Sequence, residues 1–225
     1  MLEGRLPPDG AISPDALAAG AVELGVTLDP TQLARLRAFA GLLLRWNRVH
    51  NLTAIEQPDQ VVSHHLLDSL AIAPTLEQQN QGRVLRVLDV GAGGGLPGIP
   101  LAIALPGLRF TLLDKVAKKT AFLQQAKLEI GLGNVDVVQA RVEDYRAAPF
   151  DVIVARAFSS LADLVRLTRP LLDPTGHWYA MKGTLPSSEI NELDDVRLKV
   201  RVMRTVKLRV PHLDAERHLV LIEPL

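Results

Sequence analysis

The stretch Asp89-Val90-Gly91-Ala92-Gly93-Gly94-Gly95-Leu96-Pro97-Gly98-Ile99-Pro100 directly follows the apolar run Val84-Leu85-Arg86-Val87-Leu88. Five of the eight positions from Gly91 to Gly98 are glycine. Glycines between a buried strand and a helix let the backbone turn sharply and approach a ligand, and the helix N-terminus offers free N–H groups. The stretch therefore predicts a strand, a tight turn and a helix around a nucleotide-like cofactor.

Two classes of cofactor fit this turn. The segment from Gly93 to Gly98 matches G-x-G-x-x-G, and Asp114 follows Gly93 by 21 residues, as in dinucleotide-binding folds. The order Asp89-Val90-Gly91-Ala92-Gly93 instead resembles the D-x-G-x-G loop of S-adenosylmethionine-dependent methyltransferases. We therefore expect S-adenosylmethionine as methyl donor, with a dinucleotide-dependent oxidoreductase as the alternative.

Short β-rich runs alternate with helical segments from residue 83 onward. The runs cover residues 84–90, 110–113, 135–139, 152–155 and 177–181. Such alternation favours an α/β fold with a doubly wound, mostly parallel sheet. Residues 200–206 and 218–223 follow one another without a clear helix, so we expect an antiparallel strand pairing at the C-terminal end.

Helical patterns occupy the part of the chain before the sheet. Ser13-Pro14-Asp15 and Asp29-Pro30-Thr31 are typical helix starts, and the helices are expected to end near Gly25 and at residues 46–50. A third helix is expected over residues 58–73, and the polar residues 74–82 break the pattern. We therefore predict an N-terminal helical extension over residues 1–82 and a cofactor-binding core over residues 83–225.

The composition excludes several kinds of site. With 225 residues, 48% of them apolar, the chain can bury the core of one α/β domain. It has no cysteine for a disulfide or a thiolate zinc site, and His64 and His65 would point to different sides of a helix, so we expect no metal. No apolar run approaches the roughly 20 residues of a membrane span, and the start lacks a signal-peptide pattern, so we expect a cytoplasmic protein.

The net charge of the chain does not indicate a partner. The 25 basic residues balance 25 acidic ones, so any contact with nucleic acid must come from local patches. A basic face on the N-terminal extension is one such patch, and solvation of the helices is the alternative. Its members are Arg35, Arg37, Arg45 and Arg48, joined by Lys115, Lys118 and Lys119.

Two polar positions near the strand ends suit a cofactor. Asp114 ends the second β-rich run, where a carboxylate can accept both ribose hydroxyls, and a simple helix cap is the alternative. Residues Val142 and Glu143 follow the third run, where such enzymes cover the adenine. A solvated turn is the alternative there.

The segment after the fourth run bears on the acceptor of the methyl group. Enzymes that methylate exocyclic amines of bases usually carry an Asn/Asp-Pro-Pro-aromatic segment at this place, and here it reads Ala155-Arg156-Ala157-Phe158-Ser159. A ring nitrogen such as guanine N7 presents a lone pair without a proton. Its methylation therefore needs alignment more than a general base.

An ordered set of stretches resembles the bacterial small-subunit ribosomal RNA guanine-N7 methyltransferases, also called glucose-inhibited division protein B. The resemblance runs from about Ala38 to Ile222. Besides the loop from Asp89 to Pro100, its stretches are Trp46-Asn47-Arg48-Val49-His50-Asn51-Leu52-Thr53, His65-Leu66-Leu67-Asp68-Ser69, Arg156-Ala157-Phe158, Met181-Lys182-Gly183 and Arg217-His218-Leu219-Val220.

The resemblance implies a Rossmann-like class I methyltransferase fold with S-adenosylmethionine as methyl donor. It also implies 16S rRNA or the small ribosomal subunit as partner, and N7 of one guanine, guanine-527, as acceptor. A looped, unstacked base suits this chemistry because the deep major groove of A-form RNA hides N7. We expect a monomer, and a ribosome-assembly factor that only binds RNA is the second alternative.

Matching positions carry the family's cofactor contacts onto Gly91, Leu96, Val142, Glu143 and Arg156, although Leu96 departs from the phenylalanine common in many members. Together with the loop and strand residues, this defines a predicted cofactor-binding set. It comprises Asp89, Gly91, Gly93, Gly95, Leu96, Asp114, Val142, Glu143 and Arg156.

A second set is predicted to position the substrate: Asn51, His65, Asp68, Arg156 and Lys182. Asn51 contacts RNA or simply ends a helix. His65 and Asp68, three residues apart, order the site or tie the extension to the core. Arg156 and Lys182, at carboxyl ends of strands, contact RNA or, for Arg156, the cofactor carboxylate. The alternatives are surface capping for Arg156 and a solvated side chain for Lys182, and Trp46 is expected to be core.

Overall fold

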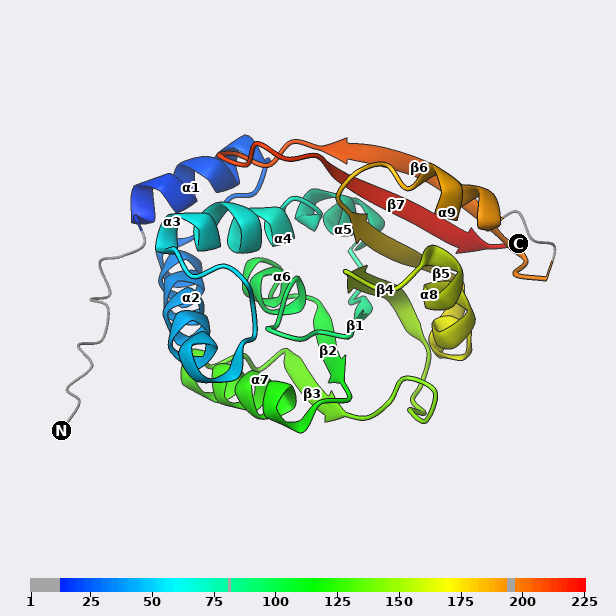
Figure 1. Ribbon diagram of the computed structural model, residues 1–225, viewed down its shortest axis with the longest axis horizontal. Helices are drawn as coiled ribbons and strands as arrows, with labels where there is room; N and C mark the ends of the chain where they lie inside the picture. Colours follow the sequence, from blue (N-terminus) through cyan, green and yellow to red (C-terminus); the bar gives the residue numbers. More distant parts are fainter. Residues whose placement is uncertain (1–12, 81, 194–196) are drawn as a thin grey trace.

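A seven-stranded sheet forms the centre of the computed structural model, which describes residues 13–80, 82–193 and 197–225 (Figure 1). The strand order is β3-β2-β1-β4-β5-β7-β6; β7 runs antiparallel to both of its neighbours, and the other neighbouring strands pair in parallel. The strands are β1 Arg86–Val90, β2 Arg109–Asp114, β3 Val135–Gln139, β4 Phe150–Arg156, β5 Leu172–Lys182, β6 Val200–Leu208 and β7 Arg217–Pro224.

The predicted strands are confirmed, with small shifts at their ends. β1 begins at Arg86, two residues after the predicted start at Val84, which is 62% exposed. β5 begins at Leu172, five residues before the predicted run. The antiparallel pairing of β6 with β7 is also confirmed.

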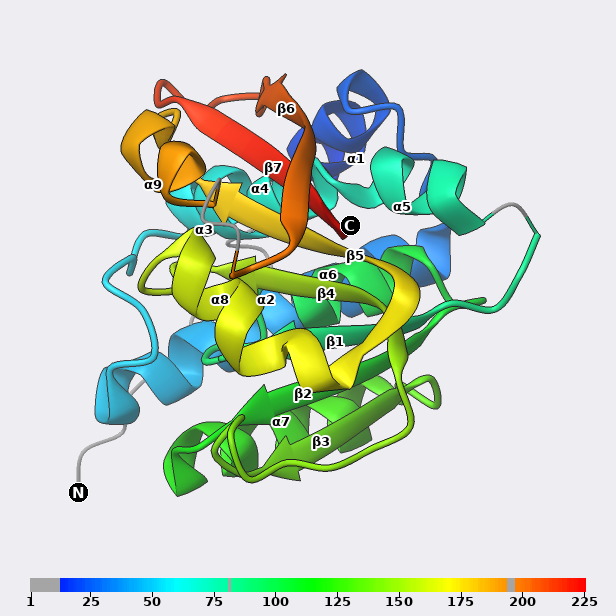
Figure 2. The same ribbon diagram turned by 90° about the vertical axis from the view of Figure 1, so that its right-hand side faces the viewer.

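Helices cover both faces of the sheet (Figure 2). Successive residues of β1 point to opposite faces, so Val87 belongs to one buried apolar cluster and Leu88 to another. The first cluster includes residues of α6 Gly98–Ala104 and α7 Ala117–Ile130, and the second includes residues of α8 Leu161–Thr168. A 3₁₀ turn, Arg169–Leu171, follows α8, and α9 Ser187–Glu192 packs against α8.

The N-terminal helices begin where the capping residues predict. Ser13 accepts the Ala16 N–H at the start of α1 Pro14–Glu23, and Asp29 forms a capping box with Gln32 at the start of α2 Pro30–His50. The third predicted helix, over residues 58–73, is a chain of short pieces: α3 Pro58–Val61, a π-helical segment Val62–Leu67 and α4 Asp68–Leu70. A further helix, α5 Ala73–Asn80, follows them.

The predicted break over residues 74–82 is wrong. Helix α5 occupies residues 73–80, with Pro74 in its first turn. Proline is tolerated at that position because the N–H it lacks would have no helical partner there. Leu76 of this helix is fully buried, which anchors α5 to the core in spite of its polar sequence.

The helical extension shares its core with the sheet domain. Phe39 and Leu43 of α2 lie in the same buried apolar cluster as Phe122 of α7 and Ile99 of α6. Trp46 packs against this cluster, with its ring centroid 5.6 Å from that of Phe122, so the expected core role is confirmed. The boundary at residue 82 stays a prediction. In the described residues, no helix has the length and apolar character needed to cross a membrane.

Candidate functional site

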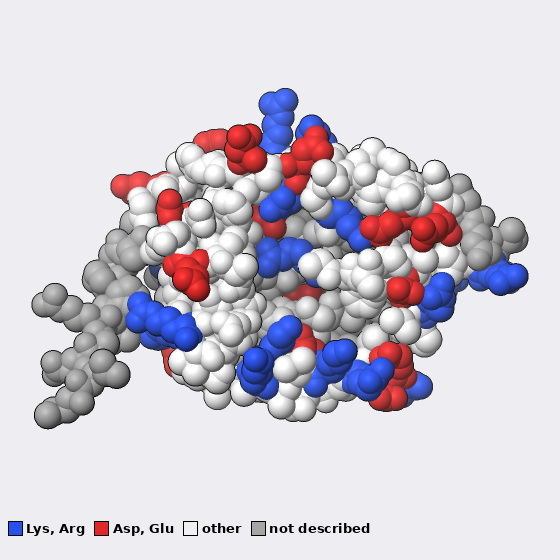
Figure 3. All heavy atoms as spheres, in the orientation of Figure 1, with Lys and Arg blue, Asp and Glu red and all other residues white. Residues whose placement is uncertain are grey.

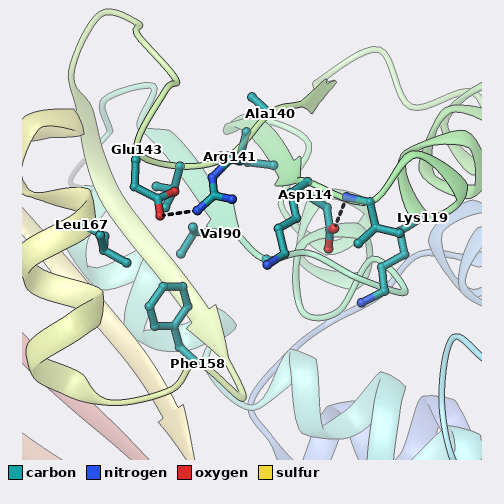
Figure 4. A pocket seen from close by; sticks show the side chains of 13 residues that line it. Val90, Asp114, Lys119, Ala140, Arg141, Glu143, Phe158 and Leu167 are labelled. Atoms are coloured by element: carbon teal, nitrogen blue, oxygen red, sulfur yellow. Dashed lines mark hydrogen bonds and ion pairs between the residues drawn. The ribbon is translucent and has the colours of Figure 1, made fainter.

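A cavity opens at the carboxyl ends of the parallel strands, beside the central strand β1. The chain leaves β1 toward β2 on one side, and β4 pairs with β1 on the other side, which is the switch point where doubly wound sheets bind ligands. Figure 4 shows the side chains around this cavity. The volume of the cavity is about 310 Å³. The cavity is lined by Val90, Gly91, Leu113, Asp114, Lys115, Val116, Lys119, Ala140, Arg141, Val142, Glu143, Phe158 and Leu167.

The glycine loop takes a shape that other residues would strain. Gly91, Gly93 and Gly95 have φ angles of 73°, 54° and 78°, in the left-handed region that favours glycine. A Cβ on Gly95 would also lie 2.6 Å from Cδ1 of Ile99. Only Gly91 of these three lines the cavity, so Gly93 and Gly95 act by allowing the turn.

Asp89 is buried and is not among the residues that line the cavity, so its contact with the cofactor stays a prediction. Its Oδ2 accepts the Gly98 N–H at 2.8 Å, which ties the end of β1 to the first residue of α6. The side chain is almost fully buried, and Oδ1 has no hydrogen-bond partner among the described residues. Burial raises the pKa of Asp89 from 3.8 to about 7.

Asp114 accepts hydrogen bonds from two backbone N–H groups, and its predicted contact with the ribose hydroxyls stays a prediction. Its Oδ1 accepts the Val116 N–H at 2.9 Å, just before α7. Val116 is the N-cap residue of α7 and has no side-chain capping bond, so the alternative of a simple helix cap is wrong. The Oδ2 of Asp114 accepts the Gly93 N–H at 2.9 Å and so joins the end of β2 to the glycine loop. Each carboxylate oxygen keeps acceptor capacity, and Asp114 also lines the cavity (Figure 4).

The opposite wall of the cavity is apolar and comes from later in the chain. Phe158 follows β4, and Leu167 belongs to α8; both face the cavity across from Asp114 (Figure 4). Val142 and Glu143 line the cavity, and Glu143 accepts a hydrogen bond from Arg141 at 3.3 Å. Their contact with the cofactor stays a prediction. Leu167 was missed because nothing in an amphipathic helix marks which apolar residue borders a cavity.

Leu96 and Arg156 lie outside the set of cavity-lining residues. Leu96 is buried in the apolar cluster that also holds α6. The Arg156 Nη1 donates to Oδ2 of Asp68 at 3.1 Å and to the His64 carbonyl at 3.2 Å. The assignment of cofactor contacts to Leu96 and Arg156 stays a prediction.

A buried carboxylate joins three parts of the chain. Asp68, 2% exposed, accepts a hydrogen bond from Arg156 at the end of β4 and a second, on Oδ1, from Nε of Arg217 at 2.8 Å. Asp68 thus ties the helical extension to β4 and β7, as one of the two predictions for it stated. The sequence did not single out Arg217 because 149 residues separate it from Asp68.

The expected pairing of His65 with Asp68 is wrong, because His65 has other partners. Its Nδ1–H donates to the His64 carbonyl at 2.9 Å, which leaves Nε2 to accept the Thr53 hydroxyl proton at 2.7 Å. Asn47 Oδ1 accepts the Thr53 N–H. Burial first, and then the charge of Arg156, lowers the pKa of His65 from 6.5 to about 4. A neutral ring therefore holds the segment after α2.

The other two substrate candidates have structural partners. Asn51, with φ 49° and ψ 56°, ends α2 in a left-handed conformation, and its N–H donates to the Asn47 carbonyl at 3.2 Å. Lys182 is 13% exposed and donates to both carboxylate oxygens of Glu189, at 3.0 and 2.8 Å. Lys182 is therefore an ion-paired residue and not the solvated lysine of the alternative. Contact of Asn51 or Lys182 with RNA stays a prediction.

The surroundings of the cavity are rich in basic side chains. The space-filling view shows Lys and Arg on both sides of a hollow near the centre of this face (Figure 3). Across the described residues, no group of three or more His, Asp or Glu side chains is placed to hold a metal ion. The site can therefore offer a glycine loop, a carboxylate and an apolar wall to one ligand, and positive charge to another.

Solved structures with a similar fold are methyltransferases. Magnesium protoporphyrin IX methyltransferase from Synechocystis PCC 6803, solved with bound SAH, matches with a TM-score of 0.57 at 15% identity. The matched region covers 80% of this chain and 93% of that methyltransferase. A SAM dependent methyltransferase from Aquifex aeolicus has a TM-score of 0.55 at 16% identity, covering 76% of this chain and 96% of its own. These similarities show the fold, and the predicted fold class is confirmed.

Sequence relatives are much closer. A protein named Ribosomal RNA small subunit methyltransferase G from Leptothrix cholodnii is 50% identical over 210 residues, which are 93% of this chain and 95% of the relative. The protein of the same name from Burkholderia pseudomallei is 51% identical over 212 residues, 92% of this chain and 89% of the relative. The sequence model of the family described as rRNA small subunit methyltransferase G matches residues 32–220, and this chain belongs to that family.

Proposed function

We propose that this protein transfers the methyl group of S-adenosylmethionine to N7 of one guanine, guanine-527, in 16S rRNA. The observation that carries the proposal is the cavity that joins the glycine loop to Asp114 in a chain of the rRNA small subunit methyltransferase G family. In this proposal the protein acts in the cytoplasm as a monomer and needs no metal.

The residues around the cavity fit S-adenosylmethionine. A volume of about 310 Å³ lies at the lower end of the range for small-molecule sites. Asp114 uses one acceptor position per oxygen for the backbone and keeps others for the two ribose hydroxyls. Val142, Phe158 and Leu167 offer an apolar surface to the adenine. Gly91 has open space where a Cβ would stand, so a ligand can approach the backbone there.

Chemistry at guanine N7 makes small demands on the protein. Bound S-adenosylmethionine supplies a methyl group on a positively charged sulfur, and N7 has a lone pair and no proton to lose. The protein therefore needs to hold the base in line and exclude water rather than act as a base. His65 has a lowered pKa and its Nε2 accepts the Thr53 hydroxyl proton, so this proposal does not use it as a base.

The positive charge beside the cavity suits an RNA substrate. Arg156 and Arg217 place two guanidinium groups on the single carboxylate of Asp68, which leaves a net positive charge at this edge of the sheet. Both arginine side chains are about a quarter exposed, at 24% and 23%, so a phosphate can reach them.

The proposal is tested by transfer of tritiated methyl from S-adenosylmethionine to small subunits and to naked 16S rRNA that lack the modification. Chemical cleavage at N7-methylguanine maps the product. Label at guanine-527 is the expected result. Label at another nucleotide or another atom would overturn the assigned acceptor.

A matched pair of variants tests the cavity. Asp114→Asn removes one carboxylate oxygen from the cavity wall and should weaken S-adenosylhomocysteine binding at least tenfold, since a charge-assisted hydrogen bond is worth about 1.5–3 kcal/mol. Asp136→Asn changes a carboxylate that is 81% exposed and should leave binding unchanged. Binding of NAD without S-adenosylhomocysteine would favour an oxidoreductase. RNA binding without methyl transfer would favour an assembly factor.

A further inference from the structure

One segment of the chain concentrates positive charge. Residues 197–209 contain six basic residues and no acidic one, which leaves 19 basic and 25 acidic residues in the rest of the chain. The six are Arg197, Lys199, Arg201, Arg204, Lys207 and Arg209. The net charge of zero is therefore the sum of one basic segment and a chain that is otherwise acidic. We call residues 197–209 the basic edge.

The basic edge forms the outermost strand of the sheet. It contains β6, the last strand in the sheet order, and Figure 1 shows this strand in orange along the top of the molecule. A register shift between Val202 and Arg204 bulges the strand at Met203, whose side chain is 47% exposed. At about 3.3 Å per residue, the nine residues of β6 extend over roughly 30 Å.

Some side chains of the basic edge are ion-paired, and others have no partner among the residues that the structure describes. Arg201 pairs with Glu223, and Lys207 pairs with Glu216 at 2.9 Å. By contrast, three exposed side chains have no hydrogen bond or ion pair with any residue that the structure describes: Lys199, Arg204 and Arg209. Exposed cations without carboxylate partners are available to an external anion.

The end of the basic edge points toward the methyl-transfer site. β6 is antiparallel to β7, which is antiparallel to β5, so β6 ends at the same side of the sheet as Lys182 and Arg156. Leu208 pairs with Arg217, the partner of Asp68, and Arg209 comes next in the chain. Four strand spacings of about 4.8 Å separate β6 from β1, so the basic edge lies roughly 20 Å from the glycine loop.

We propose that the basic edge is a second rRNA contact, on which Arg204 and Arg209 bind backbone phosphates of RNA that flanks the methylated guanine. The proposal rests on the proposed function, since it takes rRNA as the substrate. An RNA substrate can cover the distance of about 20 Å between the glycine loop and β6. Its target base can therefore lie in the cavity while its flanking strand lies on β6. The rest of the chain has 19 basic and 25 acidic residues, so RNA is attracted to the basic edge and to the basic side chains around the cavity, which favours one orientation of the RNA.

Protection of a free strand edge is the other explanation for such charges, because charged residues and bulges prevent edge-to-edge association. The two explanations differ in their consequences. Edge protection predicts that neutral Gln at Arg204 and Arg209 changes self-association and leaves RNA affinity unaltered. A phosphate contact predicts a loss of affinity that depends on salt.

The test compares Arg204→Gln/Arg209→Gln with the wild type in binding to undermethylated small subunits at several salt concentrations. Each lost phosphate contact should weaken binding about tenfold near 0.1 M salt and lower the slope of log K against log salt by about 1. The KM for the subunit should rise, while S-adenosylhomocysteine affinity stays at the wild-type value, which also shows that the variant is folded.

A control carries the same change at the opposite side of the sheet. Arg83 and Arg109 are exposed and lie at or before the amino ends of β1 and β2, so Arg83→Gln/Arg109→Gln should bind subunits as the wild type does. Unchanged affinity in the β6 variant, or equal losses in both variants, would overturn the inference. Absence of methyl transfer by the wild type would instead overturn the proposed function, so the two failures are distinguishable.

Discussion

Replacing Asp68 by Asn tests whether the helical extension is held to the sheet by one buried carboxylate. In the wild type, Asp68 is 2% exposed and accepts charge-assisted hydrogen bonds from Arg156 at 3.1 Å and from Arg217 at 2.8 Å. Asn keeps the shape but removes the negative charge and turns an N–H₂ group toward one of the two guanidinium groups. Two cations are then left side by side without a counter-charge.

The expected loss follows from these contacts. Breaking a buried ion pair by removing one partner costs about 3–5 kcal/mol. Water reaches both arginines here, since about a quarter of each side chain is exposed, so we take the lower end, about 3 kcal/mol. For a chain of this size, that loss lowers the melting temperature by roughly 6–12 °C.

Urea unfolding followed by circular dichroism measures the loss at neutral pH, with the m value expected to stay constant. Asp136→Asn is the matched control, because its carboxylate is 81% exposed and lies 3.4 Å from Lys127, and it should change stability by less than about 0.5 kcal/mol. In a double-mutant cycle with Arg217→Gln, the stability lost in the double variant should be smaller than the sum of the two single losses by at least about 1 kcal/mol. A loss at Asp68 below about 1 kcal/mol, or strict additivity, would refute the reasoning.

Three further changes probe the loop and the buried titratable groups. Gly95→Ala places a Cβ 2.6 Å from Ile99 at a φ of 78° and should cost about 2–3 kcal/mol in thermal unfolding, whereas Gly107→Ala, with open space at the Cβ, should cost under about 1 kcal/mol. Burial raises the pKa of Asp89 from 3.8 to about 7, so between these pH values the folded chain holds a proton that the unfolded chain releases. The free energy of unfolding therefore falls by up to about 4 kcal/mol as pH rises from about 4 to 7. Asp89→Asn should abolish this fall in urea titrations across that range. Burial lowers the pKa of His65 to about 4, so stability is lost as pH falls from 6.5 to about 4, by up to about 3 kcal/mol, and the pH dependence of His65→Gln should lack that loss. A variant with the wild-type pH profile would contradict the assignment to that residue.

Local signals in the sequence were sufficient for the strands, for the first two helices and for the glycine turn. A glycine run after an apolar strand, capping residues such as Asp29, and the alternation of strands with helices each depend on neighbouring residues in the chain. Asp114 was expected at the cavity because parallel strands end at one side of a sheet, whereas Gly91, Val142 and Glu143 were expected there from the resemblance to methyltransferases, and all four line one cavity.

Contacts between distant parts of the chain were decided only by the tertiary structure. Residue spacing suggested His65 as the partner of Asp68, but packing brings Arg156 and Arg217 to that carboxylate from positions 88 and 149 residues away. In the same way, Leu167 borders the cavity because α8 packs against the sheet. Arg209 reaches the same side as Arg156 because β6, paired antiparallel with β7, runs in the same direction as β4 and β5. Hydrophobic periodicity specifies which face of an element is buried, while the partners it meets depend on how all the elements pack together.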